Sequence, residues 1–338
     1  MKIAHIHVWD KKNKGDVSIV MAVQQLLKNT FGKAEITDFP VEVLKKNISQ
    51  DLKDLNKADL IVIGGGGIYY SWFTPFNIEF INKLNPPVVI FGVGYIREYG
   101  SPSLRKNDIK SIVSLNRKAV LISVRDNYTK KFLIRAGVPN KKIAVIGDPA
   151  IFLKEKKSKI GLSSKLKIGI NLNYSGWMGF GKYEKKIIRS FSKVCYYFKK
   201  YRNAKIYYLM HHPDEKNVYH KINCNGLKVI NLPPMEQKFI YGKMNLVIGM
   251  MLHSAVLSFG ANTPEINVAY DLRNRSFADF IGFPELLISS KKITENLLLE
   301  TAIKVINNEK FYRDKFKEKK EKISLNHQQF LQKIKKYV

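Results

Sequence analysis

The sequence predicts an α/β protein made of two Rossmann-like domains with parallel sheets, an interdomain cleft and C-terminal helices. Short β-rich apolar runs alternate with helical patterns along most of the chain, which is typical of parallel sheets covered by helices. Residues 154–165 interrupt this alternation with charged, Gly and Ser residues that show no periodicity, as a linker does. With 338 residues and 45% hydrophobic content, the chain is long enough to form two cores.

Residues 1–153 are expected to form the first Rossmann-like domain, because β-rich runs and helical patterns follow each other without a break. The expected strands are residues 3–8, 34–37, 60–63, 88–91, 119–123 and 143–146. The expected helices between them are residues 17–29, 76–84, 104–115 and 127–136.

The same alternation resumes after the linker, so residues 166–290 are expected to form a second Rossmann-like domain. Its expected strands are residues 167–171, 205–210, 228–230, 246–248 and 265–269. Its expected helices are residues 183–201, 236–242 and 254–260. Residues 291–338 carry two amphipathic helical patterns and end in a strongly basic stretch.

The net charge of +30 comes mostly from lysines spread along the whole chain. This charge is compatible with nucleic acid, with an anionic membrane surface and with small anionic substrates, while a general lysine-rich bias is the preferred explanation. The sequence has no RNP-like motif, zinc finger or basic zipper, so a specific nucleic-acid partner is not expected. The basic C-terminal helices favour a solvated face, with peripheral contact to an anionic membrane surface as the alternative.

Cys195 and Cys224 are the only cysteines, and no Cys/His cluster has structural-zinc spacing, so we expect neither a disulfide framework nor a metal site. The N-terminal apolar run is too short and polar for a signal peptide. No apolar run approaches the ~20 residues of a membrane span. We therefore expect a cytoplasmic protein, soluble or peripheral to the membrane.

Residues 246–271 are the most informative part of the chain. An apolar run ends at Gly249, the polar pair His253 and Ser254 opens a helical stretch, and a second β-rich run starts at Pro264. In such a unit the turn lies at the carboxyl end of the sheet, where the N–H groups of a helix N-terminus favour anions. This position nominates His253 as a catalytic histidine, with a packing role as the alternative.

Four glycines, Gly64 to Gly67, follow the apolar run after Asp59. Glycines let the main chain turn sharply and approach a ligand, as phosphate-binding turns require. The run is neither a P-loop nor a G-x-G-x-x-G dinucleotide motif. Gly65 and Gly66 are therefore candidate ligand-binding residues, and a tight structural turn explains them equally well.

Charged residues also follow strands in the first half of the chain. Asp16 precedes the periodic stretch after Val17, so we expect it to cap a helix, with catalysis as the alternative. Arg125 ends a strand and is suited to bidentate binding of a carboxylate or phosphate, whereas a surface ion pair is the structural alternative. Asp126 is expected to cap the next helix.

In the second half, His211 and His212 follow an expected strand. Adjacent side chains of an extended chain point in opposite directions, so we expect one of these histidines to be structural.

In their order and spacing, motifs along most of the chain resemble the polysaccharide pyruvyl transferase family. The matching motifs are Gly15-Asp16, residues 59–67, Gly92-Val93-Gly94, Val124-Arg125-Asp126, Gly147-Asp148-Pro149-Ala150, His212 with Asp214, residues 249–254, and residues 264–270 with Arg273. The resemblance implies a GT-B-type fold and a transferase that moves pyruvate from phosphoenolpyruvate onto two hydroxyls of a sugar, forming a ketal. It implies phosphoenolpyruvate as co-substrate, a glycan or lipid-linked sugar as acceptor, and no cofactor or metal.

The resemblance also implies roles for individual residues. His253 would protonate the methylene group of phosphoenolpyruvate, and Asp16 or His212 would take the proton of the sugar hydroxyl. The substrate-binding candidates are Gly65, Gly66, Arg125, Ser254, Tyr270 and Arg273. The chain departs from the family pattern at Met251, where arginine is usual, and at Arg273, where lysine is frequent.

Two other functions stay open on the sequence. A GT-B-type glycosyltransferase that uses a nucleotide-sugar would need the same helix N-termini for its diphosphate. A catalytically degenerate homologue that only binds glycans would explain Met251.

Overall fold

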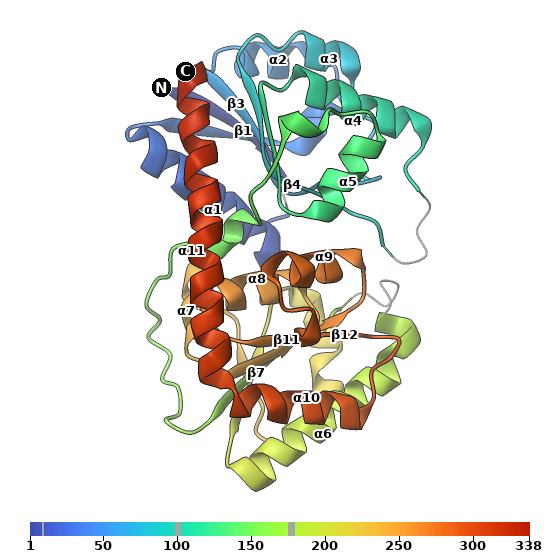
Figure 1. Ribbon diagram of the computed structural model, residues 1–338, viewed down its shortest axis with the longest axis vertical. Coiled ribbons are helices and arrows are strands. Elements are labelled where there is room, and N and C mark those ends of the chain that lie inside the picture. The colour runs from blue at the N-terminus through green and yellow to red at the C-terminus, as the bar shows by residue number, and fades with distance from the viewer. Residues whose placement is uncertain (9, 99–102, 175–179) are drawn as a thin grey trace. The chain divides into compact units, whose positions relative to one another are not determined.

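The computed structural model describes residues 1–8, 10–98, 103–174 and 180–338. The chain divides into two compact units (Figure 1). The first unit comprises Met1–Asp10, Ile19–Phe152 and Lys322–Val338, and the second comprises Lys11–Ser18 and Leu153–Glu321. The division differs from the four expected segments in that residues 11–18 count with the second unit and residues 322–338 with the first.

The first unit contains a six-stranded parallel sheet with the strand order β2-β1-β3-β4-β5-β6. Its strands are β1 (Lys2–His7), β2 (Glu35–Pro40), β3 (Leu60–Tyr69), β4 (Val88–Tyr95), β5 (Leu121–Val124) and β6 (Ile143–Val145). The helices between these strands are α1 (Lys14–Phe31), α2 (Ser49–Leu55), α3 (Ile78–Asn82), α4 (Lys106–Lys118) and α5 (Asn127–Arg135), with short 3-10 turns at Val41–Leu44, Asn140–Lys142 and Pro149–Phe152. The direction of winding reverses between β1 and β3, where doubly wound sheets bind ligands.

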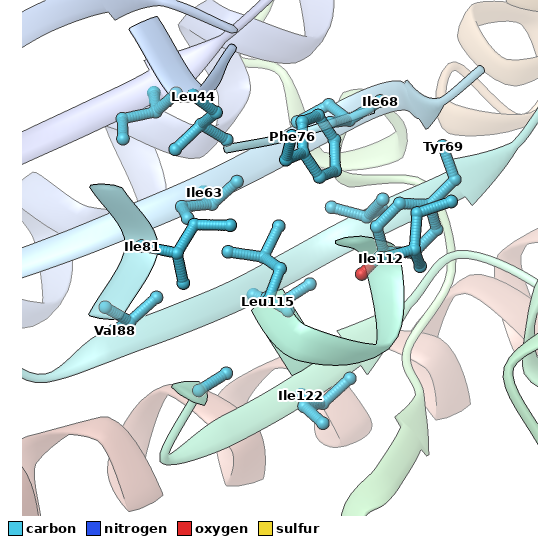
Figure 2. Close-up of a cluster of buried hydrophobic side chains, with 14 of the residues drawn as sticks. Leu44, Ile63, Ile68, Tyr69, Phe76, Ile81, Val88, Ile112, Leu115 and Ile122 are labelled. Carbon is cyan, nitrogen blue, oxygen red and sulfur yellow. The ribbon is translucent and has the colours of Figure 1, made fainter. Parts of the chain in front are cut away.

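The core of the first unit lies between its sheet and the helices that cover it. Figure 2 shows Ile63, Val88 and Ile122 of three neighbouring strands facing side chains such as Ile81 of α3 and Leu115 of α4. These side chains are buried, so apolar area removed from water stabilises the sheet–helix packing.

The C-terminal end of the chain completes this core. The ring of His327 lies 5.8 Å from that of Phe91 and 4.7 Å from that of Phe152. Phe330 also packs on Phe91, at 5.8 Å between ring centroids. The expected basic C-terminal segment is therefore amphipathic: most of its lysines are exposed, whereas Tyr312, Phe316 and Phe330 are buried.

The glycine run corrects one prediction from the sequence. We expected a strand that stops at Ile63 and a turn after it, whereas β3 continues through the glycines to Tyr69, with a register irregularity after Gly66. A Cβ on Gly65 would lie 1.9 Å from the side chain of Ile19 in α1. Gly65 therefore lets α1 pack directly on the strand, and Gly66 adopts a left-handed φ of 96° that favours glycine.

The second unit contains a six-stranded parallel sheet with the strand order β12-β11-β10-β7-β8-β9. Its strands are β7 (Lys167–Ile170), β8 (Lys205–Leu209), β9 (Lys228–Ile230), β10 (Leu246–Gly249), β11 (Glu265–Ala269) and β12 (Leu287–Ser289). Its helices are α6 (Phe180–Arg202), α7 (Pro234–Gly242), α8 (Leu252–Gly260), α9 (Leu272–Ile281), α10 (Glu295–Asn307) and α11 (Glu309–Ile334), with 3-10 turns at Pro213–Asn217, Tyr219–Lys221, Pro284–Leu286 and Lys335–Tyr337.

The strand order of the second unit is the Rossmann order, with the reversal between β7 and β10. α6 and α10 lie side by side in this unit (Figure 1). The two parallel α/β sheets predicted from the sequence are thus confirmed. Within the described ranges, no helix has the length and apolar character needed to cross a membrane.

Candidate active site

The turn between β10 and α8 lies at the reversal point of the second sheet. Asn171 directly follows β7, and its side-chain oxygen accepts hydrogen bonds from the backbone N–H groups of Met250 and Met251, each at 3.1 Å. The two strands that flank the reversal point therefore hold one turn between them. That turn places His253 in the first turn of α8, beside the positive end of the helix dipole.

His253 lies directly against the start of α1. A Cβ on Gly15 would lie 2.2 Å from Nδ1 of His253, so the imidazole occupies the space that any other residue would need. The side-chain oxygen of Asn13 accepts a hydrogen bond from the N–H of Gly15 at 3.0 Å. The expectation that Asp16 caps this helix is therefore wrong: Asp16 lies within the first helical turn, one residue after the glycine that touches His253.

The buried carboxylate of Glu265 holds the start of α8 through hydrogen bonds. The hydroxyls of Ser254 and Ser258 each donate to Oε2 of Glu265 at 2.7 Å, and Asn267 donates to Oε1 at 3.2 Å. Burial raises the pKa of the Glu265 carboxyl to about 7, against the lowering effect of these hydrogen bonds. A Cβ on Gly249 would lie 2.7 Å from Oε1 of Glu265, so the last residue of β10 has to be small.

A chain of buried hydrogen bonds links Ser254 to Tyr241 and then to His211. Ser254 accepts from Asn171 at 2.6 Å and from the Tyr241 hydroxyl at 3.1 Å. Nε2 of His211 lies 2.5 Å from the same Tyr241 hydroxyl and donates to it, since that hydroxyl gives its own proton to Ser254. Burial, and then the nearby Lys14 ammonium, lower the pKa of His211 to about 3, so this histidine is neutral. Ser254, predicted to bind substrate, is thus fully buried and its hydroxyl is used inside the protein.

Lys14 is a cation of this site that the sequence did not reveal. Its ammonium donates to the Met210 carbonyl at 2.6 Å and to the Gln237 side chain at 2.7 Å. Burial lowers the pKa of Lys14 to about 8, although the Glu215 carboxyl acts in the opposite direction. Lys14 therefore supplies positive charge near neutral pH one residue before the glycine that touches His253.

His212 points to a different environment from His211, as the alternation of an extended chain requires. Its ring stacks on Tyr174 with 4.2 Å between centroids, and its Nδ1 accepts the backbone N–H of Asp214 at 3.2 Å. Glu215 accepts the backbone N–H groups of both histidines, at 2.9 and 2.7 Å. In the neutral ring the hydrogen of His212 therefore lies on Nε2, which makes that atom a donor.

Tyr270 and Arg273 lie at the start of α9. Arg273 forms an ion pair with the buried Asp271, with Nε 2.5 Å from Oδ2, and a second guanidinium nitrogen contacts the same oxygen. The guanidinium also lies 5.9 Å from the centre of the Tyr270 ring. The charge of Arg273 is thus largely balanced by Asp271 before any ligand binds.

Arg125 lies in the first unit, as do Gly65 and Gly66, and is buried at the carboxyl end of β5. Its Nε is 3.4 Å from Asp126 and its Nη1 is 3.7 Å from Asp148. Its Nη2 is buried and has no hydrogen-bond partner among the described residues. Gly94 lies flat against the guanidinium, since a Cβ there would be 2.3 Å from Nε. Asp126 also accepts the Thr129 N–H at 2.7 Å, which confirms its predicted capping of α5.

The two units therefore hold separate groups of the predicted site residues. The second unit sets the first turn of α1, which contains Asp16, against His253 and Ser254 at the start of α8. His212, Tyr270 and Arg273 lie on neighbouring connections of the same sheet. The sequence did not reveal Lys14, Asn171 or the His211–Tyr241 pair; a polar residue directly after β7 was the one available signal for Asn171.

Solved structures with a similar fold are nucleotide-sugar enzymes. UDP-GlcNAc 2-epimerase from Neisseria meningitidis bound to UDP-GlcNAc has a TM-score of 0.62 and 13% identity, covering 99% of this chain and 100% of that one. A putative UDP-N-acetylglucosamine 2-epimerase from Listeria monocytogenes has a TM-score of 0.63 and 13% identity, covering 93% and 90%. Anabaena HepE in complex with UDP-glucose has a TM-score of 0.58 and 12% identity, covering 99% and 100%. At such identities the likeness shows the fold, which is GT-B-type.

Comparison of the sequence with curated proteins gave no match. The family model for polysaccharide pyruvyl transferase, by contrast, matches residues 13–271. This range includes both the α1 start and the β10–α8 turn that meet at His253. The chain therefore belongs to the polysaccharide pyruvyl transferase family.

Proposed function

We propose that this chain transfers pyruvate from phosphoenolpyruvate onto two hydroxyls of a sugar in a glycan or polysaccharide precursor, forming a pyruvate ketal. The contact between His253 and Gly15 carries the proposal, because it sets a proton donor at the start of α8 against the first turn of α1, the turn that also contains Asp16. Membership of the family supports the same reaction.

The site offers positive charge for a strongly anionic donor. The N-terminus of α8 favours a phosphate or carboxylate, and the Lys14 ammonium adds positive charge behind Gly15. Within the first unit, Arg125 is a separate candidate for binding an anion, because one of its buried guanidinium nitrogens has no hydrogen-bond partner among the described residues. Arg273 contributes less, because Asp271 already balances its charge.

The reaction then follows from the residue types. Protonated His253 gives its proton to the methylene carbon of phosphoenolpyruvate, while a sugar hydroxyl oxygen forms a bond to the enol carbon. The bond from that carbon to the phosphate oxygen then breaks, and the second hydroxyl attacks to close the ketal. Of the two hydroxyl protons, one replaces the proton lost by His253 and the other leaves with inorganic phosphate.

Asp16 is the better candidate for the base that accepts a hydroxyl proton. Asp16 directly follows Gly15 in the first turn of α1, whereas His212 accepts the Asp214 N–H with Nδ1 and carries its hydrogen on Nε2. A lipid-linked acceptor would lie at a membrane surface, where the net charge of +30 favours contact with anionic lipids.

A donor screen tests the proposal. Phosphate release is measured with phosphoenolpyruvate and a set of sugar diols, and thermal stabilisation is measured with phosphoenolpyruvate, UDP and UDP-sugars. We expect phosphoenolpyruvate to stabilise the protein and acceptor-dependent phosphate release to follow. Stabilisation by UDP-sugars alone would favour a glycosyltransferase, as the UDP-sugar complexes of the similar structures suggest. Glycan binding without turnover would identify a degenerate homologue.

A further inference from the structure

Three ligand-type side chains converge at the edge between β1 and β2 of the first unit. His5 and His7 are two residues apart in β1, so they lie on the same face of the sheet. The parallel register places Asp38 of β2 opposite His5. These side chains are the one group of three His, Cys, Asp or Glu residues within the described ranges whose ligand atoms all lie within 4.8 Å of one another.

Backbone carbonyls fix the orientation of both rings. Nε2 of His5 lies 2.6 Å from the Gly64 carbonyl oxygen, and Nδ1 of His7 lies 2.9 Å from that of Val8. A carbonyl oxygen only accepts, so each of these nitrogens carries a hydrogen. In neutral rings this leaves Nδ1 of His5 and Nε2 of His7 with lone pairs, and both face Asp38.

With both rings neutral, the converging ring nitrogens are therefore acceptors, like Oδ1 of Asp38, which accepts a hydrogen bond from Nε2 of Gln24 at 2.6 Å. Oδ1 of Asp38 lies 3.0 Å from Nε2 of His7 and 3.9 Å from Nδ1 of His5. Nδ1 of His5 is fully buried and has no hydrogen-bond partner among the described residues. A buried acceptor aimed at a carboxylate is unfavourable unless a positive centre lies between them.

We propose that His5, His7 and Asp38 form a binding site for a divalent transition-metal ion of the zinc class. Two imidazole nitrogens and one carboxylate oxygen are a ligand set that such ions prefer. Zinc–nitrogen bonds of about 2.0–2.1 Å in a tetrahedron place neighbouring ligand atoms roughly 3.3 Å apart. The distances from Asp38 Oδ1 to the two ring nitrogens, 3.0 and 3.9 Å, lie on either side of this value.

The surroundings also match those of known metal sites. The second nitrogen of a metal-bound histidine usually donates to a carbonyl or carboxylate, as both rings do here. The Asp38 side chain is 39% exposed, which gives an ion a path to the otherwise buried histidines. Three protein ligands leave a fourth position open for water or a substrate oxygen.

The site goes beyond the proposed function and does not depend on it. It would join β1 to β2 at the carboxyl side of the first sheet, beside the reversal point between β1 and β3. The sequence predicted no metal site, because a search for zinc spacing finds nearby Cys and His residues, whereas Asp38 comes from the next strand.

Calorimetric titration of Zn²⁺ into the full chain, made without a histidine tag and freed of metal by chelation, tests the proposal. We expect one ion per chain and no comparable heat with Mg²⁺, which prefers oxygen ligands. His7→Gln and Asp38→Asn should each weaken zinc binding at least tenfold. The exposed His220→Gln and the thiol variant Cys224→Ser are matched controls, and both should bind zinc as the wild type does.

Thermal unfolding provides a second measurement on the same proteins. Zinc should raise the melting temperature of the wild type and of both controls, but not that of His7→Gln or Asp38→Asn, whose folding is checked by circular dichroism without metal. Absence of a one-to-one zinc complex, or zinc binding that both variants retain, would overturn the proposal and leave His7 and Asp38 as an ordinary ion pair. Phosphate release from phosphoenolpyruvate, measured separately, keeps this outcome distinct from the proposed function.

Discussion

Gly15 and His253 are so close that a single methyl group at residue 15 would lie 2.2 Å from the imidazole. The two residues are far apart in the sequence, and each belongs to the first turn of a helix. The relation explains why a glycine precedes Asp16 at the start of α1, and it makes the position of the imidazole sensitive to residue 15.

Gly15→Ala should therefore displace His253 rather than unfold the protein, because a side chain can rotate away more easily than two helices can separate. We expect a turnover loss of about 10²-fold or more, in line with the loss of a positioned acid–base group, with little change in melting temperature. Gly161→Ala is the matched control, since a Cβ there meets no atom within 4 Å. Wild-type turnover in Gly15→Ala would show that His253 does not need this position.

His253→Ala should lower turnover by about 10²- to 10⁴-fold, the range typical of losing a general acid. His220→Ala, at an exposed histidine of the same unit, should retain wild-type turnover. Steady-state phosphate release with phosphoenolpyruvate and acceptor measures both. Equal rates for the two variants would remove His253 from the proton-donor role.

Glu265→Gln should change the pH dependence of stability. The folded-state pKa of about 7 lies above the ordinary 4.5, so the neutral carboxyl stabilises the fold at low pH, and this contribution is lost as pH rises through 7. Relative to Glu265→Gln, the wild type should therefore lose on the order of 3 kcal/mol of unfolding free energy between pH 4.5 and 7. Melting curves of both proteins across this range measure the difference. Parallel curves would mean that Glu265 has an ordinary pKa.

Met251→Arg tests whether phosphoenolpyruvate affinity depends on the arginine that the family usually has at this position. Met251 is only 8% exposed and occupies the N-cap position of α8, so an arginine there would have to bury its charge in a tightly packed turn. We expect phosphoenolpyruvate affinity to stay unchanged or to fall, as measured by calorimetry, and Lys14→Gln to weaken it. A gain of roughly tenfold, about 1.4 kcal/mol, in Met251→Arg would instead indicate a site that lacks a cation.

Most of the fold was predictable because each strand and helix has a local pattern. The runs 228–230 and 265–269 coincide with β9 and β11 as predicted. The missed elements are β12, which has three residues, α2, a polar seven-residue helix, and the ten-residue α9. The glycine run was read as a turn, because the local pattern does not show that Ile19 of a distant helix packs on Gly65.

The candidate site was only partly predictable for the same reason. His253 and Asp16 follow from their places at helix starts. Asn171 and Ser254 are 83 residues apart, and His211 reaches Tyr241 over 30 residues, so no local pattern links them. The orientation of a side chain likewise depends on tertiary partners, as Arg125 shows by pairing with Asp148 of a later strand connection.

The packing of His327 and Phe330 on Phe91 has a consequence for synthesis of the protein. A nascent chain that has emerged only as far as residue 152 has every strand of the first sheet but lacks the aromatic side chains that cover Phe91. Residues 19–152 therefore leave the ribosome well before residues 322–338, which complete their unit, and their exposed apolar surface needs protection until those residues arrive.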